Sequence, residues 1–251
     1  MESSVQKIKT SQPYCRACLA PVSTSIGHKD QWELLRCDDC KTVVVEPFPS
    51  IEDLTEYYAD YNKTHDYLRK KESKIRRVKK RIARILRHNP PGKRFLDVGC
   101  SIGYSAASAE PYGLDVTGID LDGVAIDIAT KEFGHLGKFE AITIEDYAER
   151  GAQTDIIYAV EVIEHVPNPE SFVKAISDLL VTGGLLYITA PDGGHWRVPK
   201  KFEDWDMVCP PDHLTYFTRK GLSTLLERHG LKIKNYQVSF KPGIKAIAVK
   251  I

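Results

Sequence analysis

The chain has 251 residues, of which 42% are hydrophobic and 27% charged, with a formal net charge of +1. This length allows one full α/β domain with a small appendage, so the sequence predicts a globular protein. The first residues, MESSVQKIKT, lack the apolar stretch of a signal peptide, and no apolar run is long enough to span a membrane. We therefore expect a cytoplasmic location.

Four of the six cysteines form two C-x2-C pairs, CRAC and CDDC, which eighteen residues separate. This spacing is typical of a zinc site in which each pair supplies two thiolates. Four cysteine ligands leave no open position, so the zinc ion is expected to be structural. Disulfides, which a reducing compartment disfavours, and free thiols are the alternatives. The sequence predicts a zinc-ribbon-like module over residues 1–48, with the ligands Cys15, Cys18, Cys37 and Cys40.

Residues 49–91 are expected to form a helical linker. Ser50 can cap a helix that carries several tyrosines. Residues 69–87 contain eleven Lys or Arg and one Glu, with apolar residues at helical spacing, so one helix face should pack on the next domain. Such a charge run is most often a solvated face. Nucleic-acid binding by the zinc ribbon and this helix is an alternative, but no aromatic residues for base stacking are interleaved with the basic run.

Strand-like and helix-like segments alternate from Arg94 onward, which predicts a doubly wound, parallel sheet. The chain closes with two strand-like segments joined by Lys-Pro-Gly, a hairpin that adds an antiparallel edge. We therefore expect an α/β domain over residues 92–251 with a mostly parallel seven-stranded sheet. The expected strands are 94–99, 115–120, 138–143, 155–161 and 185–190, and the expected helices are 103–112, 122–133, 169–180 and 218–229.

The segment FLDVGCSIG, residues 95–103, places two glycines after the first strand of this domain. Asp120 ends the second strand, where a carboxylate can accept hydrogen bonds from both hydroxyls of a ribose. A dinucleotide loop requires G-x-G-x-x-G, and Ser101 stands where the central glycine would be. The sequence therefore favours a nucleoside cofactor without phosphates, such as S-adenosylmethionine, over the nicotinamide cofactor of an oxidoreductase.

These segments resemble the class I S-adenosylmethionine-dependent methyltransferases. FLDVGCSIG is similar to their first motif, usually LDxGCGxG, and DVTGIDLD, TDIIYAVEVIEHVPNP, GGLLYITAPD and DHLTYFT follow in the family's order. The final hairpin resembles the family's sixth and seventh strands, and Ser101 is the one departure. The resemblance implies a pocket for the methionine, ribose and adenine moieties formed by Asp97, Gly99, Cys100, Ser101, Gly103, Asp120, Leu121, Ile144, Glu145 and Glu161.

Two of these assignments have ordinary structural alternatives. Asp97 can cap the following turn, and Glu145 can be a solvated residue at a helix start. Asp120 is the more specific assignment, because an acid that faces a ribose is the contact most closely tied to the motif.

A methyl group on a sulfonium is already activated, so the protein must mainly align the acceptor and remove its proton. A neutral histidine suits that task near pH 7. His165 follows the fourth strand, and Glu164 beside it could orient the ring. His213 is the second candidate base. The alternatives are a capped helix start at Glu164 and His165, and a loop tied down through His213 and its neighbours Asp212 and Tyr216.

The connection between residues 192 and 218 is long and aromatic, as functional lids often are; a surface loop with its own small core is the alternative. The zinc module and tyrosines resemble those of sugar C-methyltransferases, whereas the Glu-His-Val-Pro segment resembles quinone-biosynthesis O-methyltransferases. We expect a small-molecule or glycan acceptor, either phosphorylated or not. C- and O-methylation are both open, and an RNA methyltransferase is the alternative. The candidate acceptor contacts are Tyr58, Tyr61, Trp196 and Tyr216.

Overall fold

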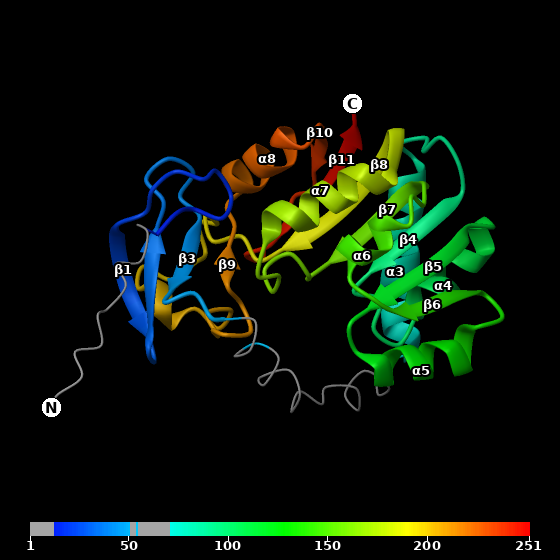
Figure 1. The fold of residues 1–251 in the computed structure, drawn as a ribbon, viewed down its shortest axis with the longest axis horizontal. Helices are drawn as coiled ribbons and strands as arrows, with labels where there is room; N and C mark the ends of the chain where they lie inside the picture. Colours follow the sequence, from blue (N-terminus) through cyan, green and yellow to red (C-terminus); the bar gives the residue numbers. More distant parts are fainter. Residues whose placement is uncertain (1–12, 51–53, 55–70) are drawn as a thin grey trace, which may run out of the picture.

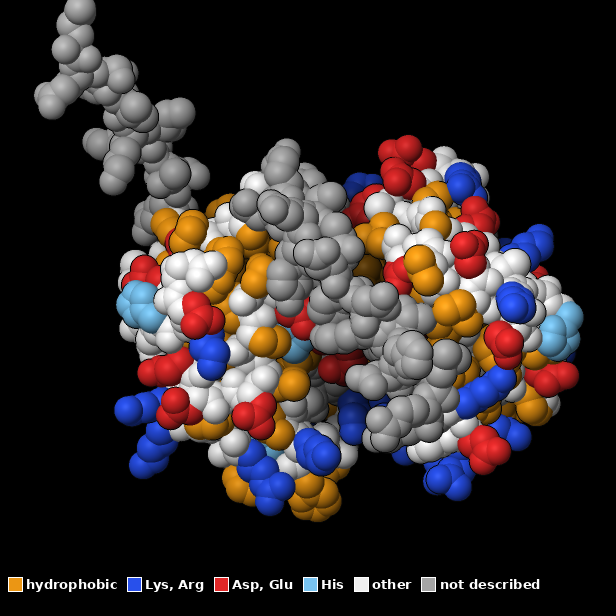
Figure 2. All heavy atoms as spheres, turned by 90° about the horizontal axis from the view of Figure 1, so that it is seen from below, with side chains coloured by type: hydrophobic (Ala, Val, Ile, Leu, Met, Phe, Trp, Pro, Cys, Tyr) orange, Lys and Arg blue, Asp and Glu red, His pale blue; other side chains and the backbone are white. Residues whose placement is uncertain are grey.

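The structure is a computed structural model in which residues 13–50, 54 and 71–251 are described. The chain forms two lobes, one built on a four-stranded sheet and the other on a seven-stranded sheet (Figure 1). Acidic and basic side chains are interspersed over both lobes in the face that Figure 2 shows. The tyrosines Tyr58 and Tyr61 and most of the helix expected after Ser50 lie outside the described residues.

The larger sheet has the strand order β10-β11-β8-β7-β4-β5-β6. Strands β6, β5, β4, β7 and β8 run parallel, and β11 pairs antiparallel with both β8 and β10. This arrangement confirms the predicted α/β fold with an antiparallel hairpin at one edge. The strands are β4 (Arg94–Val98), β5 (Asp115–Asp120), β6 (Gly137–Ala141), β7 (Thr154–Val160), β8 (Leu180–Ala190), β10 (Leu231–Tyr236) and β11 (Ile244–Lys250).

Alternating side chains of each strand pack on opposite faces of this sheet. Leu96 and Leu186 belong to one buried cluster, and their neighbours Phe95 and Leu185 belong to another. Helices α3 (Lys71–Leu86), α4 (Tyr104–Ala109) and α5 (Gly123–Phe133) cover the Phe95 face. Helices α6 (Ile144–Glu149), α7 (Pro169–Leu179) and α8 (Arg219–Arg228) cover the Leu96 face.

The basic helix α3 packs one face on the sheet domain, as its periodicity predicts, and Ile82 and Ile85 are fully buried there. Its charged residues are not all solvated. Lys71 forms an ion pair with Glu132 at 3.1 Å. Arg81 donates a hydrogen bond to the hydroxyl of Tyr158, a buried residue of the sheet domain. Parts of the charge run therefore serve the packing of the helix.

Three local elements differ from the sequence prediction. The helix expected over 103–112 ends at Ala109 and continues as a 3-10 turn (η1, Glu110–Tyr112) that contains a proline. Helix α6 was not among the expected helices, although a helix start at Glu145 was an alternative; the hydroxyl of Thr143 caps it by accepting a hydrogen bond from the backbone N–H of Asp146 at 3.0 Å. Strand β8 begins at Leu180, directly after α7, whereas the expected strand began at residue 185.

The smaller sheet combines segments from both ends of the chain. Strands β1 (Thr24–Lys29), β2 (Trp32–Arg36) and β3 (Val43–Glu46) form an antiparallel meander, and β9 (Thr215–Tyr216) adds to its edge by pairing with β3. The connection that precedes β9 includes a 3-10 turn (η2, Phe202–Asp204). Its Phe202 and Trp205 pack in a core with Leu34 of β2. This part of the connection is therefore a structural part of the smaller lobe.

Helix α8 joins the two lobes at its N-terminus. Thr218 caps the helix and also donates a hydrogen bond from Oγ1 to the carbonyl oxygen of Cys40 at 2.6 Å. A Cβ atom at Gly221 would lie 2.1 Å from Oγ1 of Thr42, so the helix approaches the cysteine segment as closely as a glycine permits. The contact holds the smaller lobe beside the carboxyl edge of the larger sheet.

Candidate active site

The glycine loop leaves the carboxyl end of β4. Gly99 and Gly103 have φ angles of 72° and 79°, in the left-handed region that glycine adopts without strain. A Cβ atom at Gly99 would lie 2.5 Å from a methyl group of Val162, so a side chain there would require the next loop to move. Ser101 also has a positive φ of 48°. This backbone conformation explains why the sequences that the loop resembles usually have glycine at this position.

The carboxylate of Asp120 lies against this loop. It accepts hydrogen bonds from the backbone N–H groups of Ser101 at 2.7 Å and Asp122 at 3.0 Å. Each carboxylate oxygen has a second lone pair, so capacity remains for two ribose hydroxyls. Burial raises the pKa of Asp120 above its ordinary value. Cys100 is buried below the loop, where it packs as a small apolar side chain.

Asp97 belongs to β4, and Glu161 directly follows the neighbouring strand β7. Burial raises the pKa of Asp97 to about 7. Glu161 follows β7 with a positive φ of 56° and accepts a hydrogen bond from the hydroxyl of Thr189. Arg81 of α3 donates a hydrogen bond to the Tyr158 hydroxyl at 2.9 Å, and its charge acts on both acids. Sequence analysis missed Arg81, although it is a cation between the apolar positions of an amphipathic helix.

The remaining candidates for the cofactor site follow the ends of β5 and β6. Ile144 is buried at the start of α6, and Leu121 is 74% exposed. The carboxylate of Glu145 accepts a hydrogen bond from the Ser171 hydroxyl of α7 at 2.9 Å. This contact ties α6 to α7, so Glu145 has a structural role in addition to any contact with a ligand.

His165 lies after β7 and contacts the loop that precedes β9. Its Nδ1 is 2.6 Å from the carbonyl oxygen of Asp212 and 3.3 Å from the Asp212 carboxylate. Because a carbonyl oxygen only accepts hydrogen bonds, Nδ1 must carry the proton, and Nε2 is the basic nitrogen of the neutral ring. Burial lowers the pKa of His165, but the hydrogen bond to Asp212 and the charges of Glu164 and Asp212 outweigh it and raise the pKa overall.

His213 and Glu164 complete this cluster. The imidazole rings of His165 and His213 meet edge to face with centroids 4.6 Å apart. His213 Nδ1 lies 2.8 Å from the carbonyl oxygen of Met207, to which it donates a hydrogen bond. Glu164 is 1% exposed, and burial raises its pKa to about 8. Within the part of the chain that the structure describes, neither of its carboxyl oxygens has a hydrogen-bond partner.

The same cluster has the composition of a cation site. The ligand atoms of Glu164, His165 and His213 all lie within 4.8 Å of one another, as do those of Cys209, Asp212 and His213. Imidazole and carboxylate groups are common ligands of divalent metal ions. The cluster can therefore act as a proton acceptor through a histidine, or it could hold a divalent cation.

The two described candidates for acceptor contacts have different positions. Tyr216 is fully buried, and its hydroxyl donates a hydrogen bond to the carbonyl oxygen of His213 at 3.2 Å. In this position Tyr216 supports the loop that carries His213, and its ring has no surface left for an acceptor. Trp196 is 75% exposed and stacks on His195. Its ring is available to a ligand, but Trp196 belongs to a different segment of the chain from His165 and His213.

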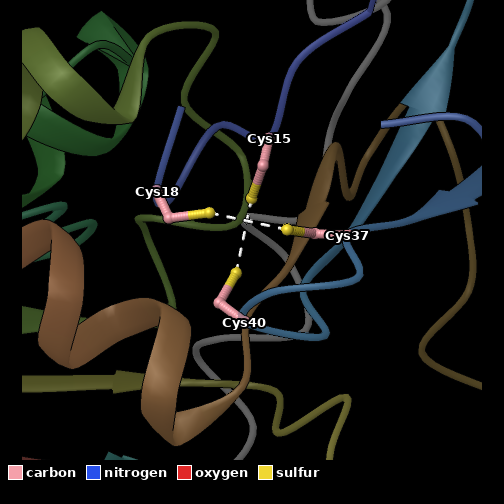
Figure 3. A group of neighbouring side chains, drawn as sticks. All are labelled: Cys15, Cys18, Cys37 and Cys40. Carbon is pink, nitrogen blue, oxygen red and sulfur yellow. Dashed lines mark hydrogen bonds between the residues drawn. The ribbon is translucent and has the colours of Figure 1, made fainter. Parts of the chain in front are cut away.

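The four cysteines of the smaller lobe converge on one point (Figure 3). The Sγ atoms of Cys15 and Cys40 are 3.5 Å apart, as are those of Cys18 and Cys37, and all four lie within 4.8 Å of one another. The two sulfur atoms of a disulfide are about 2.05 Å apart, so these distances are too long for a disulfide bond. A tetrahedral site with Zn–S bonds of about 2.3 Å separates its sulfurs by roughly 3.8 Å. The donor set and its spacing fit a zinc ion.

Comparison with known proteins identifies the larger lobe. A family model described as a methyltransferase domain matches residues 67–235, about two thirds of the chain. The chain belongs to this family. The resemblance to class I S-adenosylmethionine-dependent methyltransferases is thereby confirmed, and the methyltransferase domain contains the glycine loop, Asp120 and His165. No helix in the described part of the chain is long and apolar enough to cross a membrane.

Two relatives of this methyltransferase are both ubiquinone biosynthesis O-methyltransferases. The ubiquinone biosynthesis O-methyltransferase of Glaesserella parasuis serovar 5 is 40% identical over 106 residues, which are 39% of this chain and 45% of the relative. That of Burkholderia thailandensis is 32% identical over 160 residues, which are 56% of this chain and 68% of the relative. The match thus covers less than half of the Glaesserella relative's length.

Solved structures with this fold include the 1,6-didemethyltoxoflavin-N1-methyltransferase of Burkholderia thailandensis with bound 1,6-didemethyltoxoflavin and S-adenosylhomocysteine. The TM-score is 0.59 with 16% sequence identity, and the match covers 91% of this chain and 99% of that chain. At this identity the likeness shows the fold of the methyltransferase domain.

Proposed function

We propose that the protein transfers the methyl group of S-adenosylmethionine to a hydroxyl group of a small-molecule acceptor. The observation that carries this proposal is the 2.6 Å contact between Nδ1 of His165 and the carbonyl oxygen of Asp212, which leaves Nε2 as the basic nitrogen at the carboxyl edge of the sheet. The names of the relatives support O-methylation of an aromatic or quinone-type acceptor. They do not support the sugar or glycan acceptor expected from the zinc module, or an RNA acceptor.

The cofactor site is proposed at the glycine loop. Gly99 and Gly103 allow the backbone turns of the loop that would face the methionine moiety, Asp120 would accept hydrogen bonds from the ribose, and the buried Ile144 would form an apolar wall for the adenine. Arg81, whose charge acts on Asp97, would pair with the cofactor's carboxylate. Bound S-adenosylmethionine supplies a methyl group on a positively charged sulfur. This sulfur is a good leaving group because it departs as a neutral thioether.

The chain's own residues then align the acceptor and remove its proton. Nε2 of His165 accepts the hydroxyl proton as the acceptor oxygen bonds to the methyl carbon, and the bond from that carbon to sulfur breaks. The backbone carbonyl of Asp212 fixes the ring through Nδ1, and its carboxylate, 3.3 Å away, stabilises the imidazolium that forms. His213 packs against the ring and limits its rotation.

The cysteine cluster is proposed as a structural zinc site. The ion would be held by Cys15, Cys18, Cys37 and Cys40, and its four thiolates leave no position for a substrate. Because Cys40 accepts the hydrogen bond of Thr218, the site also stabilises the contact between the lobes.

The proposed function is tested by an acceptor screen with isotopically labelled S-adenosylmethionine and mass spectrometry. Phenols, catechols and hydroxyquinones should gain one labelled methyl group, and nucleotide sugars and RNA should not. Calorimetry should show binding of S-adenosylhomocysteine and no binding of NAD. Labelling of RNA or of a sugar in place of the phenols would contradict the proposed acceptor.

A further inference from the structure

A cavity of about 320 Å³ lies between the smaller lobe and the segment that follows β8. Arg36 at the end of β2 and Lys41 after the second cysteine pair form one wall. Gly193, Gly194 and Lys200 contribute to the other wall. None of these residues belongs to the proposed cofactor site or to the histidine cluster, so the cavity is a separate feature of the molecule.

The lining of this cavity is positively charged. It includes the cations of Arg36, Lys41 and Lys200 and no Asp or Glu. Across the described residues, none of these three side chains forms an ion pair with a carboxylate. Three cations that line one cavity without a counter-charge repel one another, and an anion in the cavity would reduce that repulsion.

Neighbouring polar groups are already engaged elsewhere. Asp192, which precedes the lining segment, is buried and pairs with Arg219 at 3.4 Å. The backbone N–H of Gly193 donates to the carbonyl oxygen of Phe217, and that of Gly194 donates to the Asp192 carboxylate. A ligand must therefore be held by the cationic side chains rather than by these backbone amides.

We propose that this cavity binds a phosphate or diphosphate group of a small molecule. A guanidinium binds two phosphate oxygens at once, and the two ammonium groups add point charges, so the three together match a diphosphate better than a single carboxylate.

The direct test is calorimetric titration of the full-length, cofactor-free protein with inorganic phosphate, pyrophosphate and uridine diphosphate at low ionic strength. Saturable binding of pyrophosphate is expected. Tighter binding of uridine diphosphate than of pyrophosphate would identify a nucleotide as the source of the phosphate, and equal binding would identify a simple phosphate ester. Methyl transfer is not measured, so the result is independent of the proposed acceptor.

The variant R36Q/K41Q should bind pyrophosphate at least tenfold more weakly. The matched control is K201Q/K232Q, which removes the same charge from two exposed lysines outside the cavity lining and should stay within twofold of the unmodified protein. If R36Q/K41Q does not fold, as judged by circular dichroism, Lys200→Glu replaces it with the same expected loss. The proposal is overturned if the unmodified protein shows no saturable binding at millimolar pyrophosphate, or if the control loses as much affinity as the cavity variant.

Discussion

The backbone carbonyl oxygen of Asp212 lies 2.6 Å from Nδ1 of His165, accepts its hydrogen bond and so determines which nitrogen of the ring is basic. If Nε2 removes the acceptor's proton, His165→Ala should lower kcat by roughly two to four powers of ten, because general base catalysis contributes about that much. The affinity for S-adenosylhomocysteine, measured by calorimetry, should stay within about twofold because the ring does not form the proposed cofactor site.

His213→Ala provides the comparison for that variant. It removes a ring that packs on His165 without removing the proposed base, so we expect a rise in KM and a smaller loss of kcat. A large loss of kcat in His213→Ala with His165→Ala nearly unaffected would move the base to His213. Loss of activity on dialysis against EDTA, with recovery on addition of a divalent cation, would instead show that the cluster acts through a metal ion.

Asp120→Ala should weaken the binding of S-adenosylhomocysteine at least tenfold. The substitution removes an acceptor for two ribose hydroxyls, and hydrogen bonds to a charged group contribute about 1.5 to 3 kcal/mol each. It also frees the backbone amides of Ser101 and Asp122, so the loop itself loses two contacts. Asp127→Ala, on the exposed side of α5, is the control. Unchanged calorimetric affinity in Asp120→Ala would exclude the ribose assignment.

Protein purified without added zinc should contain close to one equivalent of zinc per chain by elemental analysis. Cys37→Ser should lower the metal content and the thermal stability of the smaller lobe, because the binding energy of a structural zinc is folding energy. Cys209→Ser, which changes a cysteine outside the four-sulfur cluster, should retain the metal. A metal-free protein with a folded smaller lobe would contradict the zinc assignment.

The ion pair between Arg94 and Asp155 predicts a pH-dependent contribution to stability. Two hydrogen bonds from the guanidinium, at 2.9 and 2.8 Å, lower the pKa of Asp155 below its ordinary value despite its burial. The stabilisation is therefore complete above the unfolded pKa of about 3.9 and is lost as the pH falls through the lower folded value. Asp155→Asn should lower the urea midpoint between pH 5 and 8, and the difference should shrink below about pH 4. A difference that stays constant down to pH 2 would contradict this account.

Much of the methyltransferase domain could be predicted because its signals are local. The alternation of apolar strands and amphipathic helices determined the parallel sheet, and the Lys-Pro-Gly turn determined the final hairpin. The cysteine spacing predicted a cluster that the structure forms. Short elements were missed where the signal is weak, as in the six-residue helix α6, which has one buried residue.

The assembly of the site could not be predicted, because it depends on contacts between distant segments. The contact of His165 with Asp212 joins residues 47 positions apart, and no periodicity indicates it. The same is true of Tyr216, whose aromatic ring suggested an acceptor contact and whose place in β9 makes it a core residue. Motifs thus suggested candidate reacting groups, while the tertiary pairing of β3 with β9 places Tyr216 in the core.

The pairing of β3 with β9 also has a consequence for biosynthesis. The edge of β3 finds its partner only after the chain has been translated through Tyr216, and Cys40 meets Thr218 across 178 positions. During translation this edge of the cysteine lobe is unpaired, and an open strand edge is a template for aggregation. Truncation before residue 215 should therefore reduce the yield of soluble protein even though it leaves every cysteine in place.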